Sequence, residues 1–209
     1  MQSHAFTRKR GRPRSPDTER RIIRAAQASF ADRGFDGIAM DDLARTAGAS
    51  KATVYLYYGS KQELFQAAVE DLLATLPPPS ELTSRITGDG VEERLLVVAR
   101  RLNRLYSGAS FELIRRALAS DIPPSLRERI WEMAGKPYFD AIDEAMGAIA
   151  GLGDRSATIH FIALIAGPET LRSRWSGSAA APADEASLRD AVRVFVRGHA
   201  VPPTQGTRR

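Results

Sequence analysis

The chain has 209 residues, a formal net charge of +5 and no cysteine, and 43% of its residues are hydrophobic. This length allows one or two compact domains, and the hydrophobic fraction is high enough for a packed core. The lack of cysteine excludes disulfides, thiol nucleophiles and cysteine-based metal sites. No apolar run reaches the roughly 18 residues of a membrane span, and no apolar stretch comes after the basic N-terminus as in a secretory signal. We therefore expect a cytoplasmic protein with no membrane partner.

Positive charge is concentrated near the N-terminus. Residues 8–14 (RKRGRPR) contain five basic side chains and no acidic one, so the rest of the chain is close to neutral. A basic arm on a neutral body is typical of a protein that binds a polyanion. Taken alone, such a run is more often a solvated tail, so its interpretation depends on the helices predicted after residue 15.

Four helices are predicted after this arm. The first runs from about Asp17 to Gly34, where we expect a left-handed glycine, because Ile22, Ile23, Ala26 and Phe30 recur at helical spacing. A short helix over about 40–47 ends before Gly48, and a third begins after Ser50 and runs to about Tyr58. The fourth begins after a capping Ser60 and continues to about Leu76, where three prolines stop it.

Further helices are predicted over about 91–107, 110–120, 124–150, 154–173 and 184–199, with a loop over 80–90 and a kink near Gly135 and Pro137. No window alternates with the period of a strand, so we expect an all-α fold. The pattern divides the chain into a flexible arm (1–15), a helix-turn-helix domain (16–62), a larger helical effector-binding and dimerisation domain (63–200) and a disordered tail (201–209).

Three short helices with a glycine turn between the second and third are the pattern of a helix-turn-helix. If Val54 and Tyr58 face inward, the third helix directs Lys51, Ala52, Tyr55 and Leu56 outward. Exposed large side chains on so short a helix are costly without a partner, and the major groove of DNA provides one. We expect Thr53, Tyr57 and Lys61 to reach phosphates, since Lys61 also lies at a helix N-terminus that attracts anions.

The run IIRAAQASFADRGFDGIAMDDLARTAGASKATVYLYYGSKQELF, residues 22–65, resembles the DNA-binding domain of the TetR (tetracycline repressor) family. The resemblance covers about a fifth of the chain. It implies that Lys51, Ala52 and Thr53 begin the recognition helix, that Tyr55 contacts DNA, and that Tyr57 and Lys61 contact its backbone. The sequence departs from the family where Ile38 and Ala39 replace the usual threonine or serine before the second helix, so Asp41 is expected to help cap that helix instead.

The arm is similar to an AT-hook, in which arginines enter a narrow A·T-rich minor groove. On this interpretation Arg10, Arg12 and Arg14 add contacts to double-stranded DNA.

The family resemblance also implies a pocket between the C-terminal helices for a small, largely apolar effector. The side chains expected to line it are aromatic or large and apolar: Leu102, Tyr106, Phe111, Trp131, Met133, Tyr138 and Phe161. For each of them, simple core packing is the alternative.

In the family the last two long helices pair with their counterparts in a homodimer. Here these helices would use one stripe of Ile159, Ile162, Ala163 and Ala166 and another of Leu188, Ala191, Val192 and Phe195, although both stripes also suit an intramolecular core.

The combined interpretation is a ligand-responsive transcription regulator, a repressor that an effector releases from a palindromic operator. A DNA-binding dimer without an effector is the alternative, in which the C-terminal domain serves only dimerisation or protein contacts. A helical enzyme is a third possibility, but no catalytic constellation supports one, and we expect no cofactor. The three histidines are far apart in sequence, so no metal site is expected, and His160 is interpreted as a core or interface residue.

Overall fold

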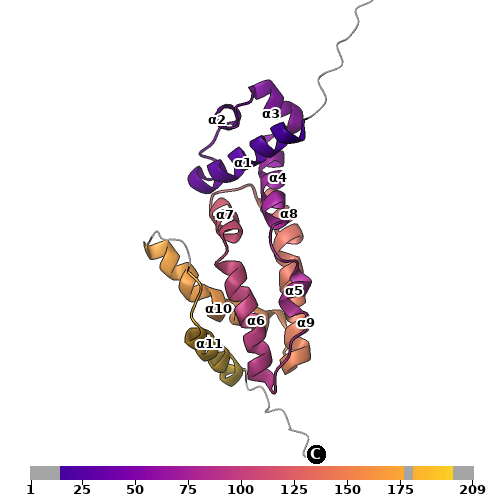
Figure 1. The fold of residues 1–209 in the computed structure, drawn as a ribbon, viewed down its shortest axis with the longest axis vertical. Coiled ribbons are helices and arrows are strands. Elements are labelled where there is room, and N and C mark those ends of the chain that lie inside the picture. The colour runs from indigo at the N-terminus through magenta and orange to yellow at the C-terminus, as the bar shows by residue number, and fades with distance from the viewer. Residues whose placement is uncertain (1–14, 177–180, 200–209) are drawn as a thin grey trace, which may run out of the picture.

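A computed structural model describes residues 15–176 and 181–199 of the chain. All regular structure in these residues is helical, as the sequence predicts (Figure 1). The elements in chain order are α1 (Pro16–Arg33), α2 (Met40–Thr46), α3 (Lys51–Tyr57), α4 (Lys61–Leu73), α5 (Pro79–Thr83), α6 (Val91–Tyr106), α7 (Ala109–Leu118), α8 (Pro124–Ile130), the π-helical turn η1 (Trp131–Gly135), α9 (Lys136–Ala150), α10 (Arg155–Ser176) and α11 (Glu185–Gly198).

Two features of α1 decide where it begins and ends. Pro16 occupies its first turn, where the missing N–H costs nothing, and Ser15 is the N-cap residue without a capping hydrogen bond from its side chain. Gly34 ends the helix with φ 73° and ψ 178°, so its φ is positive as expected, but its ψ lies outside the predicted left-handed helical region. The Gly34 N–H bonds to the carbonyl of Phe30.

Short polar side chains also fix the ends of the next helices. The Ser50 hydroxyl accepts a hydrogen bond from the Thr53 N–H at 3.0 Å and caps α3. At α4 the Ser60 hydroxyl accepts from the Glu63 N–H, and the Glu63 carboxylate accepts from the Gly59 N–H at 3.0 Å. These two caps position α3 and α4 relative to the turn between them.

An aromatic cluster forms the centre of the N-terminal core. Phe65 of α4 packs edge-on against Phe30 and Phe35, with ring centroids 4.9 and 5.3 Å away. Burying each of these rings contributes about 1.5–3 kcal/mol of stability. Residues of α7, α8 and the segment between them, including Ala117, Ile122 and Leu126, belong to the same core.

The C-terminal core lies between α6, α9, α10 and α11. Phe161 of α10 and Phe195 of α11 are fully buried and pack edge-on at 5.1 Å. Figure 1 shows α1–α3 at one end of an elongated molecule, with α4 leading from them toward the remaining helices. Because α7 and α8 contribute to the N-terminal core, side-chain packing is continuous across residue 62. The domain boundary predicted at that residue stays a prediction.

The structure corrects three predicted elements. The segment predicted as a loop over 80–90 contains the short helix α5. Helix α4 ends at Leu73, and residues up to Leu76 form a turn before the prolines. The helix predicted over 124–150 is interrupted at η1, next to the expected kink, where a Cβ on Gly135 would overlap the Trp131 ring.

Within the described residues no single helix is both long and apolar enough to cross a membrane, although one bent pair, Pro124–Ala150 with Arg155–Pro168, meets the length and composition criteria.

Candidate nucleic-acid interface and apolar cavity

Helix α3 presents two large side chains to solvent. Val54 is fully buried, whereas Tyr55 is 43% and Leu56 57% exposed. Lys51 and Ala52 are exposed beside them, and Thr53 is half-buried. This is the orientation that the sequence predicts, with Val54 as the anchor and Tyr58 half-buried behind it. A seven-residue helix thus offers an apolar and basic outer surface.

Lys51 is held by an acid of the preceding helix. Its ammonium lies 2.8 Å from the Asp41 carboxylate, and both side chains are exposed. This hydrogen bond raises the pKa of Lys51 above its usual value. Asp41 was expected to help cap α2, but the N-cap of α2 is Ala39 without a side-chain cap. That expectation is wrong, because the Asp41 carboxylate pairs with Lys51 across the turn.

Tyr57 and Lys61, the two expected phosphate contacts, make internal hydrogen bonds. The Tyr57 hydroxyl accepts from the Ser15 N–H at 2.6 Å and lies 3.2 Å from the Ser15 carbonyl, to which it donates. The Lys61 ammonium donates to the Ile38 carbonyl at 3.0 Å and lies 4.4 Å from the centre of the Phe35 ring. An ammonium has three N–H donors, so these contacts leave Lys61 able to bind an anion as well.

The arm residues Arg10, Arg12 and Arg14 lie outside the described residues. Their predicted contacts with the minor groove stay predictions.

A cavity of about 700 Å³ lies between α4, α6, α7, the α8–η1–α9 segment and α10. Small-molecule sites fall between about 300 and 1,000 Å³. The cavity is mostly apolar and aromatic, and its lining comprises Leu73, Leu76, Leu102, Leu105, Tyr106, Phe111, Ile114, Arg115, Leu118, Ala119, Arg127, Ile130, Trp131, Ala134, Gly135, Tyr138, Phe139, Ile142, Ile162 and Thr170.

Five of the seven side chains predicted to line a pocket do so: Leu102, Tyr106, Phe111, Trp131 and Tyr138. The other two predictions are wrong as lining residues. Met133 packs against the N-terminal core and lines a separate hollow beside Leu73 and Pro137. Phe161 is fully buried against Phe195. That these five residues bind a ligand stays a prediction.

Two tyrosines of the cavity differ in their hydrogen bonding. Tyr138 donates to the Pro77 carbonyl at 2.7 Å. The Tyr106 hydroxyl has no hydrogen-bond partner within the part of the chain that the structure describes, and burial raises the pKa of Tyr106 to about 12. A neutral hydroxyl therefore lies at the cavity wall, available to a ligand.

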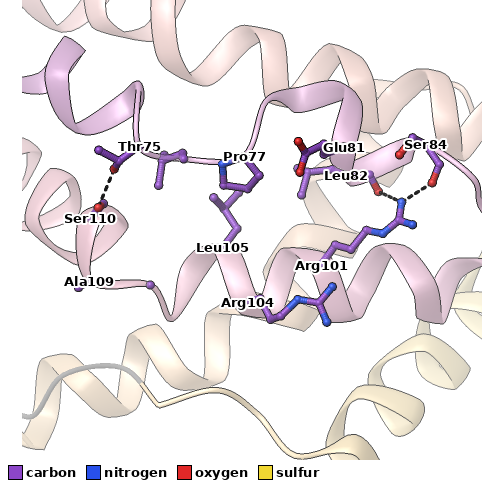
Figure 2. A pocket seen from close by; sticks show the side chains of 12 residues that line it. Thr75, Pro77, Glu81, Leu82, Ser84, Arg101, Arg104, Leu105, Ala109 and Ser110 are labelled. Carbon is purple, nitrogen blue, oxygen red and sulfur yellow. Dashed lines mark hydrogen bonds between the residues drawn. The ribbon is translucent and has the colours of Figure 1, made fainter.

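A second, more polar hollow of about 550 Å³ lies on the other side of Leu76 and Leu105, which line both spaces. Figure 2 shows its walls, with Thr75 facing Ser110 across the gap between the end of α4 and the start of α7. Their hydroxyl oxygens are 2.8 Å apart. This hydrogen bond joins the turn after α4 directly to a helix that lines the cavity.

Known proteins resemble this chain in both sequence and fold. Residues 22–68 match the family model described as "Bacterial regulatory proteins, tetR family". The HTH-type transcriptional repressor SCO4008 of Streptomyces coelicolor is 42% identical over 69 residues, which are 31% of this chain and 36% of the relative. The uncharacterized HTH-type transcriptional regulator YdeS of Bacillus subtilis is 29% identical over 116 residues, or 54% of each chain. These matches span about half or less of each relative's length.

The likeness in fold extends over most of the chain. A TetR family transcriptional regulator from Pseudomonas syringae superposes with a TM-score of 0.66 at 25% identity, covering 88% of this chain and 97% of that structure. The chain thus resembles TetR-family regulators in the sequence of its DNA-binding region and in its fold. The resemblance seen in the sequence is thus confirmed, and so is the all-α class with an N-terminal helix-turn-helix.

The last two helices, α10 and α11, expose an apolar face that differs from the predicted one. Leu188, Val192 and Phe195 of α11 are buried within the protomer, because α11 packs on α6 and α10. The exposed large side chains are Ile159, Leu171 and Trp175 of α10 and Val194 of α11, which are 49–86% exposed. The predicted dimer stripe is therefore wrong for α11 and correct in exposure only for Ile159 and Ala163 on α10.

His160 is neither buried nor part of the core. It is exposed on α10, and its Nδ1 lies 3.4 Å from Nε2 of His199. The sequence interpretation as a core histidine is wrong, and an interface role stays a prediction.

Sequence reasoning missed Arg115, Arg127 and Ser120. The two arginines line the cavity although they fall where a helical pattern indicates a solvated face. The Ser120 hydroxyl accepts a hydrogen bond from the Phe35 N–H at 2.9 Å, across 85 residues. No local signal in the sequence marks such a long-range contact.

Proposed function

We propose that this chain is a sequence-specific, DNA-binding transcription regulator of the TetR family. It acts as a homodimer, and a small effector releases it from a palindromic operator. The observation that carries the proposal is the outer surface of α3, where Tyr55 and Leu56 are exposed on a helix anchored by the buried Val54. Exposed apolar groups on such a helix are suited to thymine methyls and base edges in the major groove.

In the proposed complex Lys51, Ala52, Thr53, Tyr55 and Leu56 face base edges, while Tyr57 and Lys61 contact phosphates. The Tyr57 hydroxyl is bound to the backbone of Ser15, so α3 and the start of α1 are joined at this surface. Ser15 therefore lies beside the proposed interface. From there Arg10, Arg12 and Arg14 would follow the adjacent minor groove.

Dimerisation uses the exposed apolar face of α10 and α11. Leu171 is 59% and Val194 58% exposed, and Trp175 is 86% exposed. Such a face is unfavourable in water and is suited to a second copy of the chain. A two-fold dimer places its recognition helices in successive major grooves, about 34–36 Å apart, which requires a palindromic operator.

The effector would occupy the 700 Å³ cavity, which supports a ligand-responsive regulator over a dimer without an effector. Leu73 and Leu76, at the end of α4 and just beyond it, line this cavity, and α4 begins at Lys61 beside the DNA-binding surface. A ligand could bind more tightly to a conformation in which the two recognition helices of the dimer are not spaced for successive major grooves. Such a ligand would increase the population of that conformation and so release the DNA. We propose repression because the relative SCO4008 is named a repressor. A regulator of this kind is not an enzyme and acts in the cytoplasm.

The proposal is tested by selecting bound sites from a random DNA pool and measuring affinity for the selected site by fluorescence anisotropy. Tyr55→Ala should weaken specific binding by at least about fivefold, since one good base contact contributes about 1–3 kcal/mol. Ala148→Ser, on α9 far from this surface, is the control and should bind as the parent does. Failure to enrich any palindromic site, or full affinity in Tyr55→Ala, would contradict the proposal.

The phosphate contacts have their own readout. Lys61→Gln should reduce the dependence of log K on log salt by about one phosphate's worth. Because Lys61 also bonds to Ile38, thermal unfolding of this variant has to be measured alongside, so that a loss of folding is not mistaken for a loss of contact. An unchanged salt slope in a folded Lys61→Gln protein would remove Lys61 from the interface.

A further inference from the structure

The charges at the cavity wall distinguish among ligand classes. Among the described residues that line the cavity, Arg115 and Arg127 are the only charged ones, and both lie where α7 approaches α8. The other lining residues are apolar or aromatic, apart from the tyrosine hydroxyls and Thr170. A basic group beside an otherwise apolar chamber is suited to a ligand that combines an apolar body with an anionic end.

The two arginines differ in how far their charge is already compensated. Arg115 is bound at 2.8 and 2.7 Å by both oxygens of Glu112, which is largely buried. Glu112 also accepts a hydrogen bond from Arg116 at 3.0 Å. One carboxylate is thus shared by two guanidinium groups, and its hydrogen bond from Arg115 lowers the pKa of Glu112.

The hydrogen bonds of Arg127 are longer than those of Arg115. It reaches the Leu118 and Ser120 carbonyls at 3.4 Å each, beyond the usual 2.7–3.2 Å of a good N–H···O hydrogen bond. No carboxylate of the described residues lies within 4.0 Å of it. With Glu112 as the one acid bonded to this group of three arginines, a net positive charge remains at this end of the cavity.

We infer that the effector is a monocarboxylate with a large apolar body, whose carboxylate pairs with Arg127 while its apolar part fills the chamber. A guanidinium group offers two parallel N–H donors that match the two oxygens of a carboxylate. An amine would be repelled by the same group, and a neutral molecule would leave Arg127 without a stronger partner. This inference rests on the proposed effector role of the cavity.

The position of Arg127 also suggests how binding would be sensed. Its two carbonyl partners flank Ala119, which lines the cavity, and Ser120 holds the Phe35 N–H of the DNA-binding region. A carboxylate that takes over the Arg127 guanidinium replaces its weak bonds to this segment. The charged end of the ligand would therefore act on the piece of chain that joins the cavity wall to the α1–α2 turn.

The experiment titrates the full chain with dodecanoate, dodecan-1-ol and dodecylamine, each below its micellar concentration or solubility limit, and measures binding by calorimetry. An aromatic series of 4-phenylbutyrate, 4-phenylbutan-1-ol and 4-phenylbutylamine covers a body of different shape. In at least one series the carboxylate should bind about tenfold or more tightly than the alcohol, and the amine most weakly, as expected for one charge-assisted pair.

Arg127→Gln should reduce the affinity for the carboxylate to that for the alcohol and leave the alcohol unchanged. Arg127→Glu should reverse the order, so that the amine binds most tightly. The control Arg129→Gln removes a neighbouring α8 arginine that reaches Gln66 and does not line the cavity, and it should keep the preference of the parent.

Equal affinity for carboxylate and alcohol, tightest binding of the amine to the parent, or binding of no member of either series would overturn the inference. So would a carboxylate preference that survives in a folded Arg127→Gln protein. Binding to the selected DNA site is measured separately. If the alcohol releases DNA as well as the carboxylate does, the effector role stands and the inference fails. If the chain binds no DNA, the proposed function fails while the calorimetry still reports the charge preference.

Discussion

Ser120 and Phe35 join the helix that lines the cavity to the turn that begins the helix-turn-helix. The Phe35 N–H donates to the Ser120 hydroxyl at 2.9 Å, and this hydroxyl donates to the Ala117 carbonyl at 2.7 Å. Leu118 and Ala119, the two residues before Ser120, line the cavity. Residues that line the cavity are therefore adjacent in the chain to the residue that is bonded to the helix-turn-helix region.

Ser120→Ala should reduce the free energy of unfolding by about 1–3 kcal/mol, because it leaves the partly buried Phe35 N–H without a partner. The measurement is urea unfolding followed by circular dichroism. Ser125→Ala, at an exposed position of α8, is the matched control and should change stability by less than about 0.5 kcal/mol. Equal stability of the two variants would show that the Ser120 bond contributes nothing in solution.

Gly34→Ala should be more damaging than the same change at Gly198. Gly34 has a φ of 73°, and a Cβ there would lie 2.7 Å from the Ser120 Cβ, so both backbone strain and a clash oppose the methyl group. We expect a loss of more than about 1 kcal/mol in free energy of unfolding. Nothing lies within 4 Å of a Cβ on Gly198 at the end of α11, so Gly198→Ala should be neutral or slightly stabilising. Similar unfolding midpoints for the two variants would contradict this prediction.

Leu171→Glu combined with Val194→Glu should convert the proposed dimer to a monomer, because it places two carboxylates in the exposed apolar face of α10 and α11. Sedimentation equilibrium gives the molecular mass, and circular dichroism checks that the helices are kept. Ala148→Glu, an exposed position on α9, adds a carboxylate elsewhere and should leave the mass unchanged. A dimeric double variant would place the interface on another surface.

The sequence predicts the N-terminal half more closely than the rest because its signals are local. Capping serines, glycines at turns and a short apolar stripe fix α1–α4 to within a few residues, and Val54 is buried as predicted. Helix α11 has apolar side chains on two faces, and packing against α6 and α10 decides which of these faces is buried. Helical periodicity alone does not distinguish a face buried within the protomer from one left exposed.

Which residues line the cavity is likewise only partly predictable from the sequence. The predicted aromatic residues line it where they lie on helices that surround it, but Phe161 does not, because its contact with Phe195 decides its surroundings. Arg115 is half-buried and Arg127 is exposed, both on amphipathic helices, and their part in the cavity results only from the way α7 meets α8.

Tyr106→Phe should remove a pH dependence of stability between pH 10 and 12. Burial raises the pKa of Tyr106 to about 12, whereas an unfolded tyrosine ionises near pH 10, so only the unfolded state loses its proton in this window. The parent keeps this contribution to stability below pH 10 and loses it as the pH rises toward 12, by up to about 2–3 kcal/mol for a shift of two pH units. Other groups titrate in both proteins, so the quantity to measure is the difference in unfolding free energy between parent and Tyr106→Phe. That difference should be constant below pH 10 and move against the parent above it; a difference that stays constant up to pH 12 would mean that the hydroxyl is solvated and does not lie at a desolvated cavity wall.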